Sequence, residues 1–380
     1  MGDIVASQRQ GSRSVTDPSS RDASALSSRA RASGDSPRVL IAGAFLSAAT
    51  GIRYVCEELA DGLRSRGWQV LTTSAVEPRV PRLLDMLATV WLKRPLFDVA
   101  QVDVYSGPAF VWAEAVSASL IMLRCPFVVT VHSGALPEFA ARWPTRVRRL
   151  LRAASVVTSP SAYLQEQLRP YRSDVRVVHN GLHLDRYLAR DPGPASPRLV
   201  WIRTYEQRYN PLLALQVVQR LAVDYPRVEL VMVGPDAGDW SAAQQLEEAA
   251  RLGVDGRVDI RGPVDKTDIP RILRRGDIFL NTTNVDNAPV TVVEAMACGL
   301  CVVSTDAGGV SKLVRDGIDG LLVPRGDPEA MAAAVARILR EPDLARRLSR
   351  NARRKAQTFA WTRVLPEWEM LLSAVAGKRP

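Results

Sequence analysis

From Pro37 onward, short apolar segments alternate with amphipathic segments of helical period, and this alternation limits the chain to few folds. The segment 38–43, RVLIAG, is typical of a buried strand because of its run of branched residues. A helix is predicted next at 51–66, closed by Gly67. Further strands are predicted at 69–72, 100–105, 127–131, 156–158 and 176–179. This order predicts a parallel sheet with helices on both faces.

A Pro/Gly-rich stretch, DPGPASP at 191–197, interrupts the series and is predicted to be a linker. The alternation then restarts, with strands predicted at 198–202, 229–233, 258–260, 278–280, 301–304 and 321–323. Helices are predicted at 211–225, 241–252, 289–298, 328–340 and 361–375. The predicted fold class is therefore α/β, with two Rossmann-like, doubly wound domains that face a central cleft at the carboxyl ends of their strands.

The domain boundaries follow from the same pattern. A chain of 380 residues has room for two such domains. We expect an N-terminal domain at 37–190 and a C-terminal domain at 198–358, followed by a terminal segment at 359–380. Residues 1–36 are rich in Ser, Arg and Ala and have almost no large apolar side chains, so we expect a disordered tail.

The composition indicates anionic partners and a cytoplasmic location. The 50 Lys and Arg residues outnumber the 40 Asp and Glu residues, and a net charge of +10 suits nucleotide diphosphates, acidic lipid headgroups or nucleic acid. We expect no nucleic-acid partner, because the basic stretches carry no recognition motif and no interleaved aromatic residues. Neither a secretory signal nor an apolar run long enough to span a bilayer is found. We therefore expect a soluble protein, or one peripheral to the cytoplasmic face of the inner membrane.

The four cysteines are too few for a disulfide scaffold in a chain of this length. Cys298 and Cys301 form a C-x-x-C pair, which raises the alternatives of a metal or redox site and a packing role. The pair lies in the apolar stretch MACGLCVV, and no second pair exists to complete a four-ligand zinc site. The sequence thus favours two small buried side chains and no metal site.

The segment 277–320 holds the densest set of candidate functional residues. A predicted strand leads into a polar loop, and a helix then opens at Pro289, with Asp286 or Asn287 placed to cap it. The first free amides of this helix include those of Val290 and Thr291. A helix start that faces the cleft would provide a site for an anion or a hydroxyl group.

Glu294 follows in the first turns of the same helix, among apolar neighbours. A carboxylate in such surroundings needs a partner to justify its burial. The vicinal hydroxyls of a ribose would supply two donors to one carboxylate.

The run DNAPVTVVEAMACGL at 286–300 resembles the E-G-x-P-x-x-x-x-E-A-M-A-x-G-x-P signature of retaining GT-B glycosyltransferases. The resemblance is to the large family of bacterial polysaccharide and phosphatidylinositol mannosyltransferases, glycosyltransferase family 4, group 1. It implies a GT-B fold, in which the C-terminal helix at 359–380 returns to the first domain. It also implies that Glu294 binds the ribose of the donor, and that Asp286 contacts the transferred sugar together with following backbone amides, among them those of Asn287, Val290 and Thr291. The chain departs from the signature at Asp286, Asn287 and Cys301, where Glu, Gly and Pro are usual.

Further segments match the same family. Arg203 and Arg208 are five residues apart, like the Arg and Lys of the family's G-R-x-x-x-x-K-G segment, and the resemblance implies that they stabilise a leaving nucleotide diphosphate. Gly51 takes the position of a glycine whose backbone approaches the phosphates. His132 takes the position of a histidine that faces the donor sugar.

The resemblance implies a hexosyltransferase that retains the anomeric configuration. Its co-substrate would be a UDP-, GDP- or ADP-linked sugar, and no further cofactor would be required. No D-x-D triplet occurs in the chain, so we expect arginine rather than a metal ion to stabilise the diphosphate. The acceptor would be a sugar, a glycan or a lipid-linked molecule, in the synthesis of bacterial cell-surface polysaccharide or glycolipid.

Two alternatives for the function stay open. A nucleotide-sugar 2-epimerase on a similar fold would need acids and bases on both faces of one sugar carbon. The other alternative is an inactive relative that still binds a nucleotide sugar, given the substitutions at 202, 286, 287 and 312.

Two basic amphipathic segments, 80–93 and 142–152, raise a separate hypothesis. Either segment could hold the first domain on an anionic membrane surface, where a lipid-linked acceptor would be found. The alternative is that one segment packs on the sheet and the other is a solvated face.

Overall fold

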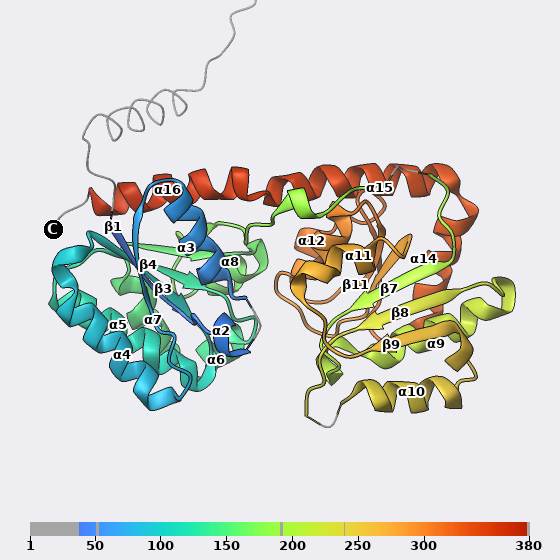
Figure 1. The fold of residues 1–380 in the computed structure, drawn as a ribbon, viewed down its shortest axis with the longest axis horizontal. Coiled ribbons are helices and arrows are strands. Elements are labelled where there is room, and N and C mark those ends of the chain that lie inside the picture. The colour runs from blue at the N-terminus through green and yellow to red at the C-terminus, as the bar shows by residue number, and fades with distance from the viewer. Residues whose placement is uncertain (1–37, 51–52, 191–192, 239, 378–380) are drawn as a thin grey trace, which may run out of the picture. The chain divides into compact units, whose positions relative to one another are not determined.

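The computed structural model describes residues 38–50, 53–190, 193–238 and 240–377. The predicted tail at 1–36 lies outside these residues, as do Gly51 and the first two residues of the predicted linker. The described chain forms two parallel sheets, each with its own helices (Figure 1). We call them the first lobe, which precedes the linker, and the second lobe, which follows it.

The first lobe contains a six-stranded parallel sheet in the order β2-β1-β3-β4-β5-β6. Its strands are β1 (Arg38–Ala42), β2 (Gln69–Thr73), β3 (Val99–Val104), β4 (Phe127–Val131), β5 (Val156–Ser159) and β6 (Arg176–Val177). Every residue of β3 and β4 is buried, so helices must cover both faces of the sheet.

The helices of the first lobe divide between these two faces. They are α2 (Ser47–Thr50), α3 (Val55–Ser65), α4 (Arg79–Leu92), α5 (Phe110–Met122), α6 (Leu136–Arg142), α7 (Pro144–Ala153) and α8 (Ala162–Leu168). On one face, Leu40 and Val102 of the strands share a core with α4 and α5. On the other face, Val39 and Ile41 share a core with α3 and the C-terminal helix. Successive residues of one strand thus point to opposite cores.

The second lobe repeats this plan with a six-stranded parallel sheet in the order β12-β11-β10-β7-β8-β9. Its strands are β7 (Arg198–Ile202), β8 (Glu229–Val233), β9 (Val258–Arg261), β10 (Ile278–Asn281), β11 (Cys301–Thr305) and β12 (Leu321–Val323). Its helices are α9 (Pro211–Asp224), α10 (Ala242–Arg251), α11 (Ile269–Leu273), α12 (Val290–Ala297), α13 (Val310–Leu313) and α14 (Pro328–Arg340). Short 3-10 helices are η1 (Arg94–Leu96), η2 (Gly107–Ala109), η3 (Leu184–Arg186), η4 (Gln207–Tyr209), η5 (Asp255–Arg257), η6 (Lys266–Asp268) and η7 (Gln357–Phe359).

The C-terminal helices connect the second lobe back to the first. Helix α15 (Pro342–Ala356) packs on α12, and α16 (Trp361–Ala376) packs on α3 and on the sheet beside it (Figure 1). Trp361, Trp368 and Leu372 of α16 are buried in the same core as Val39 and Ile41. The fold class is therefore confirmed, including the return of the last helix to the first domain.

Each strand expected from the sequence is present within two residues of its expected ends. The largest difference is at β6, which ends at Val177 instead of continuing to His179. The His179 ring instead forms a 2.9 Å hydrogen bond through Nδ1 to the Pro160 carbonyl and contacts the ring of Phe359. In the described part of the chain, no helix combines the length and the apolar character needed to cross a bilayer.

Cys298 and Cys301 lie in the core of the second lobe, with 0% and 3% of their surfaces exposed. Burial raises the pKa of the Cys298 thiol to about 12 and that of Cys301 to about 11. The described residues contain no cluster of three metal-ligating side chains. The burial expected for both cysteines is confirmed.

Candidate functional site

A cavity of about 790 Å³, here called the central cavity, opens where strands of both lobes end. Its walls include segments that follow β4, β7 and β10, the carboxyl ends at which doubly wound sheets bind ligands. The lining residues are Arg53, Tyr54, Val55, Tyr105, His132, Gly134, Ala135, Glu138, Pro160, Asn180, Arg203, Glu206, Gln207, Arg208, Tyr209, Asn284, Val285, Asp286, Asn287, Ala288 and Val290. Most of the residues predicted for the site therefore meet in one cavity.

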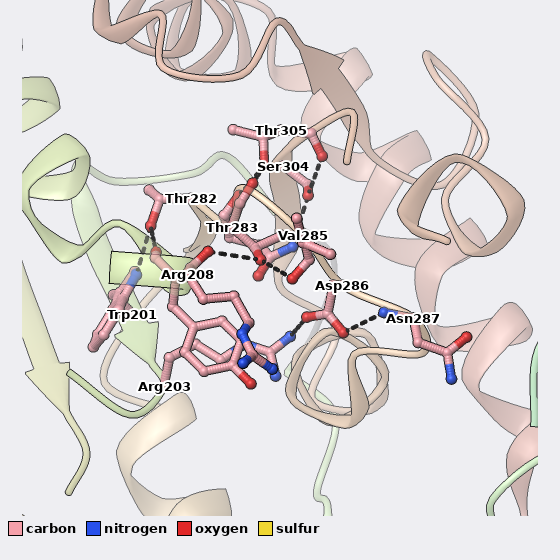
Figure 2. A network of polar contacts seen from close by, with 12 residues as sticks. Trp201, Arg203, Arg208, Thr282, Thr283, Val285, Asp286, Asn287, Ser304 and Thr305 are labelled. Atoms are coloured by element: carbon pink, nitrogen blue, oxygen red, sulfur yellow. Dashed lines mark hydrogen bonds and ion pairs between the residues drawn. The ribbon is translucent and has the colours of Figure 1, made fainter. Parts of the chain in front are cut away.

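Arg203 and Asp286 form an ion pair in the wall of this cavity (Figure 2). Nη2 of Arg203 lies 2.5 Å from Oδ2 of Asp286, and Oδ1 accepts a 2.8 Å hydrogen bond from the amide of Asn287. The guanidinium carbon also lies 4.9 Å from the centroid of the Tyr209 ring, a cation–π arrangement. The sequence predicts separate roles for Arg203 and Asp286, whereas the structure couples them.

Arg208 lines the same cavity and is more exposed than Arg203, with 54% of its side chain accessible. Its guanidinium is 3.4 Å from the carboxylate of Glu206, a separation that allows only a weak exposed pair. Its backbone is better held, since the Arg208 carbonyl accepts a 2.7 Å hydrogen bond from the amide of Asn284. Arg208 can thus turn toward a ligand without losing a strong partner.

Threonines after β10 hydrogen-bond to the loop that carries Arg203 and Arg208 (Figure 2). Thr282 accepts a 2.8 Å hydrogen bond from the indole of Trp201 and donates one of 2.7 Å to the Tyr209 carbonyl. Thr283 donates to the Val285 carbonyl at 2.9 Å. The polar run NTTN therefore fixes the loop after β7 against the loop that carries Asp286.

Two glycines allow backbones to approach closely at the site. A side chain at Gly308, whose φ is +59°, would place its Cβ 2.2 Å from the Asp286 carbonyl oxygen. A Cβ at Gly234 would lie 1.7 Å from the carbonyl oxygen of Arg203. Neither contact can be relieved by a rotamer change, so glycine is required behind both members of the ion pair.

Helix α12 begins differently from the expectation that Asp286 or Asn287 would cap it. Its N-cap is Pro289, which has no side-chain donor or acceptor, so the predicted cap is wrong. Within the described residues the amides of Val290 and Thr291 have no hydrogen-bond acceptor, and Val290 lines the cavity. The hydroxyl of Thr291 is buried and also lacks a partner among the described groups. The expected anion or hydroxyl site at this helix start is therefore available.

The side chain of Asn287 is committed to contacts between the lobes, which explains why it does not cap the helix. Its Oδ1 accepts a short hydrogen bond from the Ser161 hydroxyl. Its Nδ2 donates to the His132 carbonyl at 3.4 Å. Only 8% of Asn287 is exposed, so it acts mainly as a tie across the cavity.

His132 follows β4 and lines the cavity, and its ring contacts two residues of the neighbouring strand segment. Its Nε2 lies 2.9 Å from Oδ1 of Asp103, and its ring stacks on Tyr105 with centroids 5.5 Å apart. Asp103 is a buried strand residue whose other carboxylate oxygen has no partner among the described residues. Sequence reasoning missed Asp103, although an acid inside the apolar run of β3 was a usable signal.

Glu294 lies one turn beyond Val290 in α12 and is only 3% exposed. Its Oε1 accepts a 2.7 Å hydrogen bond from the hydroxyl of Tyr187. Burial raises the pKa of Glu294, while the Tyr187 hydrogen bond and the charges of Lys266 and Arg203 act in the opposite direction. The carboxylate thus has a partner within the protein, Tyr187, which nothing in the sequence marked, and the expected ribose contact stays a prediction.

Comparison with protein families gives two matches that together span most of the chain. Residues 49–186 match the family described as Glycosyltransferase Family 4, and residues 194–355 match Glycosyl transferases group 1. The D-inositol 3-phosphate glycosyltransferase of Streptomyces bingchenggensis is 29% identical over 268 residues, which cover 63% of this chain and 59% of that protein. The protein of the same name from Geodermatophilus obscurus is 30% identical over 261 residues, 64% of this chain and 57% of that protein. The chain thus spans less than two thirds of the length of these relatives.

Solved structures show the same two-lobed fold at low sequence identity. HepE from Anabaena, in complex with UDP, has a TM-score of 0.70 at 16% identity and covers 89% of this chain and 100% of its own. Sucrose-phosphate synthase from Thermosynechococcus elongatus has a TM-score of 0.70 at 18% identity, with coverage of 88% and 98%. At such identities the likeness concerns the fold alone.

Proposed function

Because the chain belongs to the glycosyltransferases of family 4 and group 1, we propose that it transfers a sugar from a nucleoside-diphosphate sugar to an acceptor with retention of configuration. The observation that carries this proposal is the convergence of Arg203, Arg208 and the free amide of Val290 on one cavity. Two cations and a helix start in one cavity suit a diphosphate, whose charge grows as it leaves.

In this mechanism Arg203 and Arg208 stabilise the leaving diphosphate. Arg203 is held by Asp286 and by the ring of Tyr209, so its guanidinium is preorganised before the donor binds. Asp286 and Glu206 are each paired with an arginine, so we assign neither of them as a covalent nucleophile; retention would then require the acceptor to attack from the face that the diphosphate leaves. The departing phosphate then takes the acceptor proton, and the chain contributes charge stabilisation and alignment.

Glu294 is the residue that we assign to the donor ribose. Its Oε1 bonds to Tyr187, and its Oε2 accepts no hydrogen bond from another described residue. Ribose hydroxyls would supply donors to this oxygen. UDP is the first nucleotide to test, because HepE is described in complex with UDP and with UDP-glucose.

The first lobe is proposed to bind the acceptor. Its side of the central cavity carries the cation Arg53, the acid Glu138 and the His132–Asp103 pair, groups that suit a polyhydroxylated or phosphorylated acceptor. The curated relatives are named as D-inositol 3-phosphate glycosyltransferases, so an inositol phosphate is a reasonable first acceptor. A role in cell-surface glycan or glycolipid synthesis at the cytoplasmic side of a membrane is part of the same proposal.

Thermal unfolding in the presence of UDP, GDP and ADP provides the test of donor binding. A ligand present at 100 times its Kd adds about 2.7 kcal/mol to the free energy of unfolding of the state that binds it. We therefore expect one nucleoside diphosphate to raise the Tm by several degrees. If none of the three raises it at millimolar concentration, the protein does not bind a nucleotide donor and the proposed transfer is contradicted.

Product analysis then separates transfer from epimerisation. With the stabilising nucleotide sugar and D-inositol 3-phosphate, we expect nucleoside diphosphate and a new glycoside, and no change in rate when a chelator is added. Without an acceptor, a transferase leaves the sugar of its donor unchanged, whereas a 2-epimerase converts it to the epimer. Epimer formation without acceptor would contradict the proposal.

A surface on the first lobe favours an anionic membrane as a further partner. Apolar side chains of α4, η1 and α5, at least 45% exposed, form what we call the α4–α5 surface: Val80, Leu84, Trp91, Leu92, Leu96, Val111, Ile121 and Met122. Helices α4 and α5 pack against each other (Figure 1). Trp91 donates a 3.2 Å hydrogen bond to Ser119 across their junction. Exposed Arg79, Lys93 and Arg124 accompany these side chains. Apolar side chains with basic neighbours are the features of a helix that lies in a membrane interface.

We expect the chain to co-sediment with vesicles that contain phosphatidylglycerol, and less with vesicles of phosphatidylcholine alone. Leu84→Glu combined with Leu92→Glu should reduce the bound fraction several-fold, because it places two acids among the apolar side chains. Val223→Glu is the matched control, since Val223 is 83% exposed on the second lobe. Absence of binding to anionic vesicles at low salt would end the membrane hypothesis.

A further inference from the structure

Tyr187 is the only residue, among those the structure describes, that donates a hydrogen bond to the carboxylate of Glu294. The two residues are 107 positions apart, and the 2.7 Å contact between the hydroxyl and Oε1 is buried. Tyr187 itself is 3% exposed, so its hydroxyl cannot use water as a substitute partner. The carboxylate is therefore oriented by one group from outside its own helix.

The backbone of Tyr187 is fastened to the same helix that carries Glu294. Nη1 of Arg353, in α15, donates a 3.0 Å hydrogen bond to the Tyr187 carbonyl and a second, shorter one to the carbonyl of Ala297 at the end of α12. The amide of Arg190 donates to the Cys298 carbonyl at 3.1 Å. Segment 187–190 thus lies along α12, and this fixes the position of the Tyr187 ring relative to Glu294.

The charges around Glu294 make this hydrogen bond important for its ionisation. Burial raises the pKa of Glu294, and the charge of Glu58 acts in the same direction. The Tyr187 hydrogen bond is the largest opposing influence, followed by the charges of Lys266 and Arg203. Lys266 is shared, because its ammonium lies 2.7 Å from the carboxylate of Glu58. The Cys298 thiol is the remaining titratable group that interacts with Glu294.

We propose that Tyr187 is a positioning residue, which orients the Glu294 carboxylate to accept both vicinal hydroxyls of a ribonucleoside diphosphate. The inference rests on the proposed function. With Oε1 anchored by the tyrosine, Oε2 and the second lone pair of Oε1 remain for the 2′- and 3′-hydroxyls. The site would then discriminate against a 2′-deoxyribose, which would leave a buried acceptor without one of its donors.

Tyr187→Phe keeps the ring and removes only the hydroxyl. We expect the Kd for the ribonucleoside diphosphate to rise about tenfold, since the carboxylate loses the donor that orients it toward the ribose before binding. The preference for ribose over 2′-deoxyribose should shrink. The pH below which affinity falls should move upward, because the ionised carboxylate has lost its main stabilising donor. A role in packing alone would change neither the preference nor the pH profile.

Isothermal titration calorimetry with UDP, GDP and ADP, and with their 2′-deoxy forms, tests this inference between about pH 5 and pH 9. Tyr205→Phe is the matched control, because its buried hydroxyl donates to the Arg261 carbonyl at 2.9 Å and does not contact Glu294. The control should keep the affinity, the preference and the pH profile of the wild type.

The possible outcomes distinguish a failure of donor binding from a failure of the role proposed for Tyr187. If the wild type binds none of the nucleotides, the proposed function fails and this inference fails with it. If the wild type binds a nucleotide but does not prefer ribose, donor binding stands and the role of Tyr187 is wrong. The role is also wrong if Tyr187→Phe matches the wild type in its preference and its pH profile.

Discussion

Arg203→Ala is expected to lower kcat for release of nucleoside diphosphate by about 10²–10³, the usual cost of removing one preorganised group that stabilises a leaving anion. The guanidinium is fixed by Asp286 and stacked on Tyr209, so a solvent cation cannot reproduce its position. Steady-state kinetics with the nucleotide sugar that stabilises the wild type would measure the effect. We expect a smaller change in KM, because the charge on the diphosphate grows mainly in the transition state.

The same substitution also leaves Asp286 without its cation, and a control must separate this structural effect from catalysis. Asp286 is 11% exposed, so Arg203→Ala should lower the Tm. The double variant Arg203→Ala, Asp286→Ala should recover part of the Tm but none of the activity. Arg261→Ala, which breaks an exposed pair with Asp259, should change kcat little. If Arg203→Ala keeps activity within about threefold of the wild type, the assignment of Arg203 to the diphosphate is wrong.

The fold was largely predictable because its signal is local. Strands such as β4 and β11 are buried on both faces, and this requires continuous apolar runs that can be read directly from the sequence. Helix starts were less predictable. The expected cap at Asp286 or Asn287 failed because both side chains have distant partners, Arg203 and Ser161, that local spacing does not show.

The same holds for the site: sequence motifs identified its residues, but not the residues that contact them. The motif before Glu294 and the spacing of Arg203 and Arg208 identified residues that line one cavity, whereas Glu294 is buried one turn beyond Val290 in α12. Their partners came from far along the chain, since Tyr187 and Glu294 are 107 positions apart. No periodicity connects such residues, and only the packing of α12 against segment 187–190 brings them together. Gly51 lies outside the described residues, so its assigned role stays a prediction.

Helix α4 shows how an amphipathic pattern can mislead. The sequence groups Val80, Leu84 and Trp91 on one apolar face, which packing on the sheet would normally bury. In the structure these side chains are 46–70% exposed, whereas Met86 and Val90 face the core. The pattern correctly identified an apolar face, and the tertiary structure shows that this face is free within the described chain.

Glu294→Gln is expected to have opposite effects on nucleotide binding and on stability. The amide has one acceptor oxygen and no charge, so the Kd for the nucleoside diphosphate should rise about 10- to 100-fold. The ligand-free protein should become more stable, because burial penalises the ionised form of Glu294 and the neutral amide avoids this penalty. The Tyr187 hydroxyl can still donate to the amide oxygen, so its hydrogen bond is kept.

The stability gain should depend on pH in a defined direction. Because the folded state raises the pKa of Glu294 above its ordinary value of 4.5, the stability that proton binding provides is complete below that value and is lost as the pH rises through the folded pKa. The Tm difference between Glu294→Gln and the wild type should therefore be small near pH 4, grow as the pH rises, and level off above the folded pKa. Thermal unfolding of both proteins across this range, without nucleotide, measures it.

These measurements distinguish a carboxylate kept for binding from one kept for structure. If Glu294→Gln is more stable without ligand and binds the nucleotide more weakly, Glu294 serves nucleotide binding and makes the free protein less stable. If Glu294→Gln keeps wild-type affinity, the ribose assignment is wrong, whatever happens to the Tm. If the variant is less stable than the wild type near pH 8, the ionised carboxylate stabilises the fold, and its burial is then fully offset by Tyr187, Lys266 and Arg203.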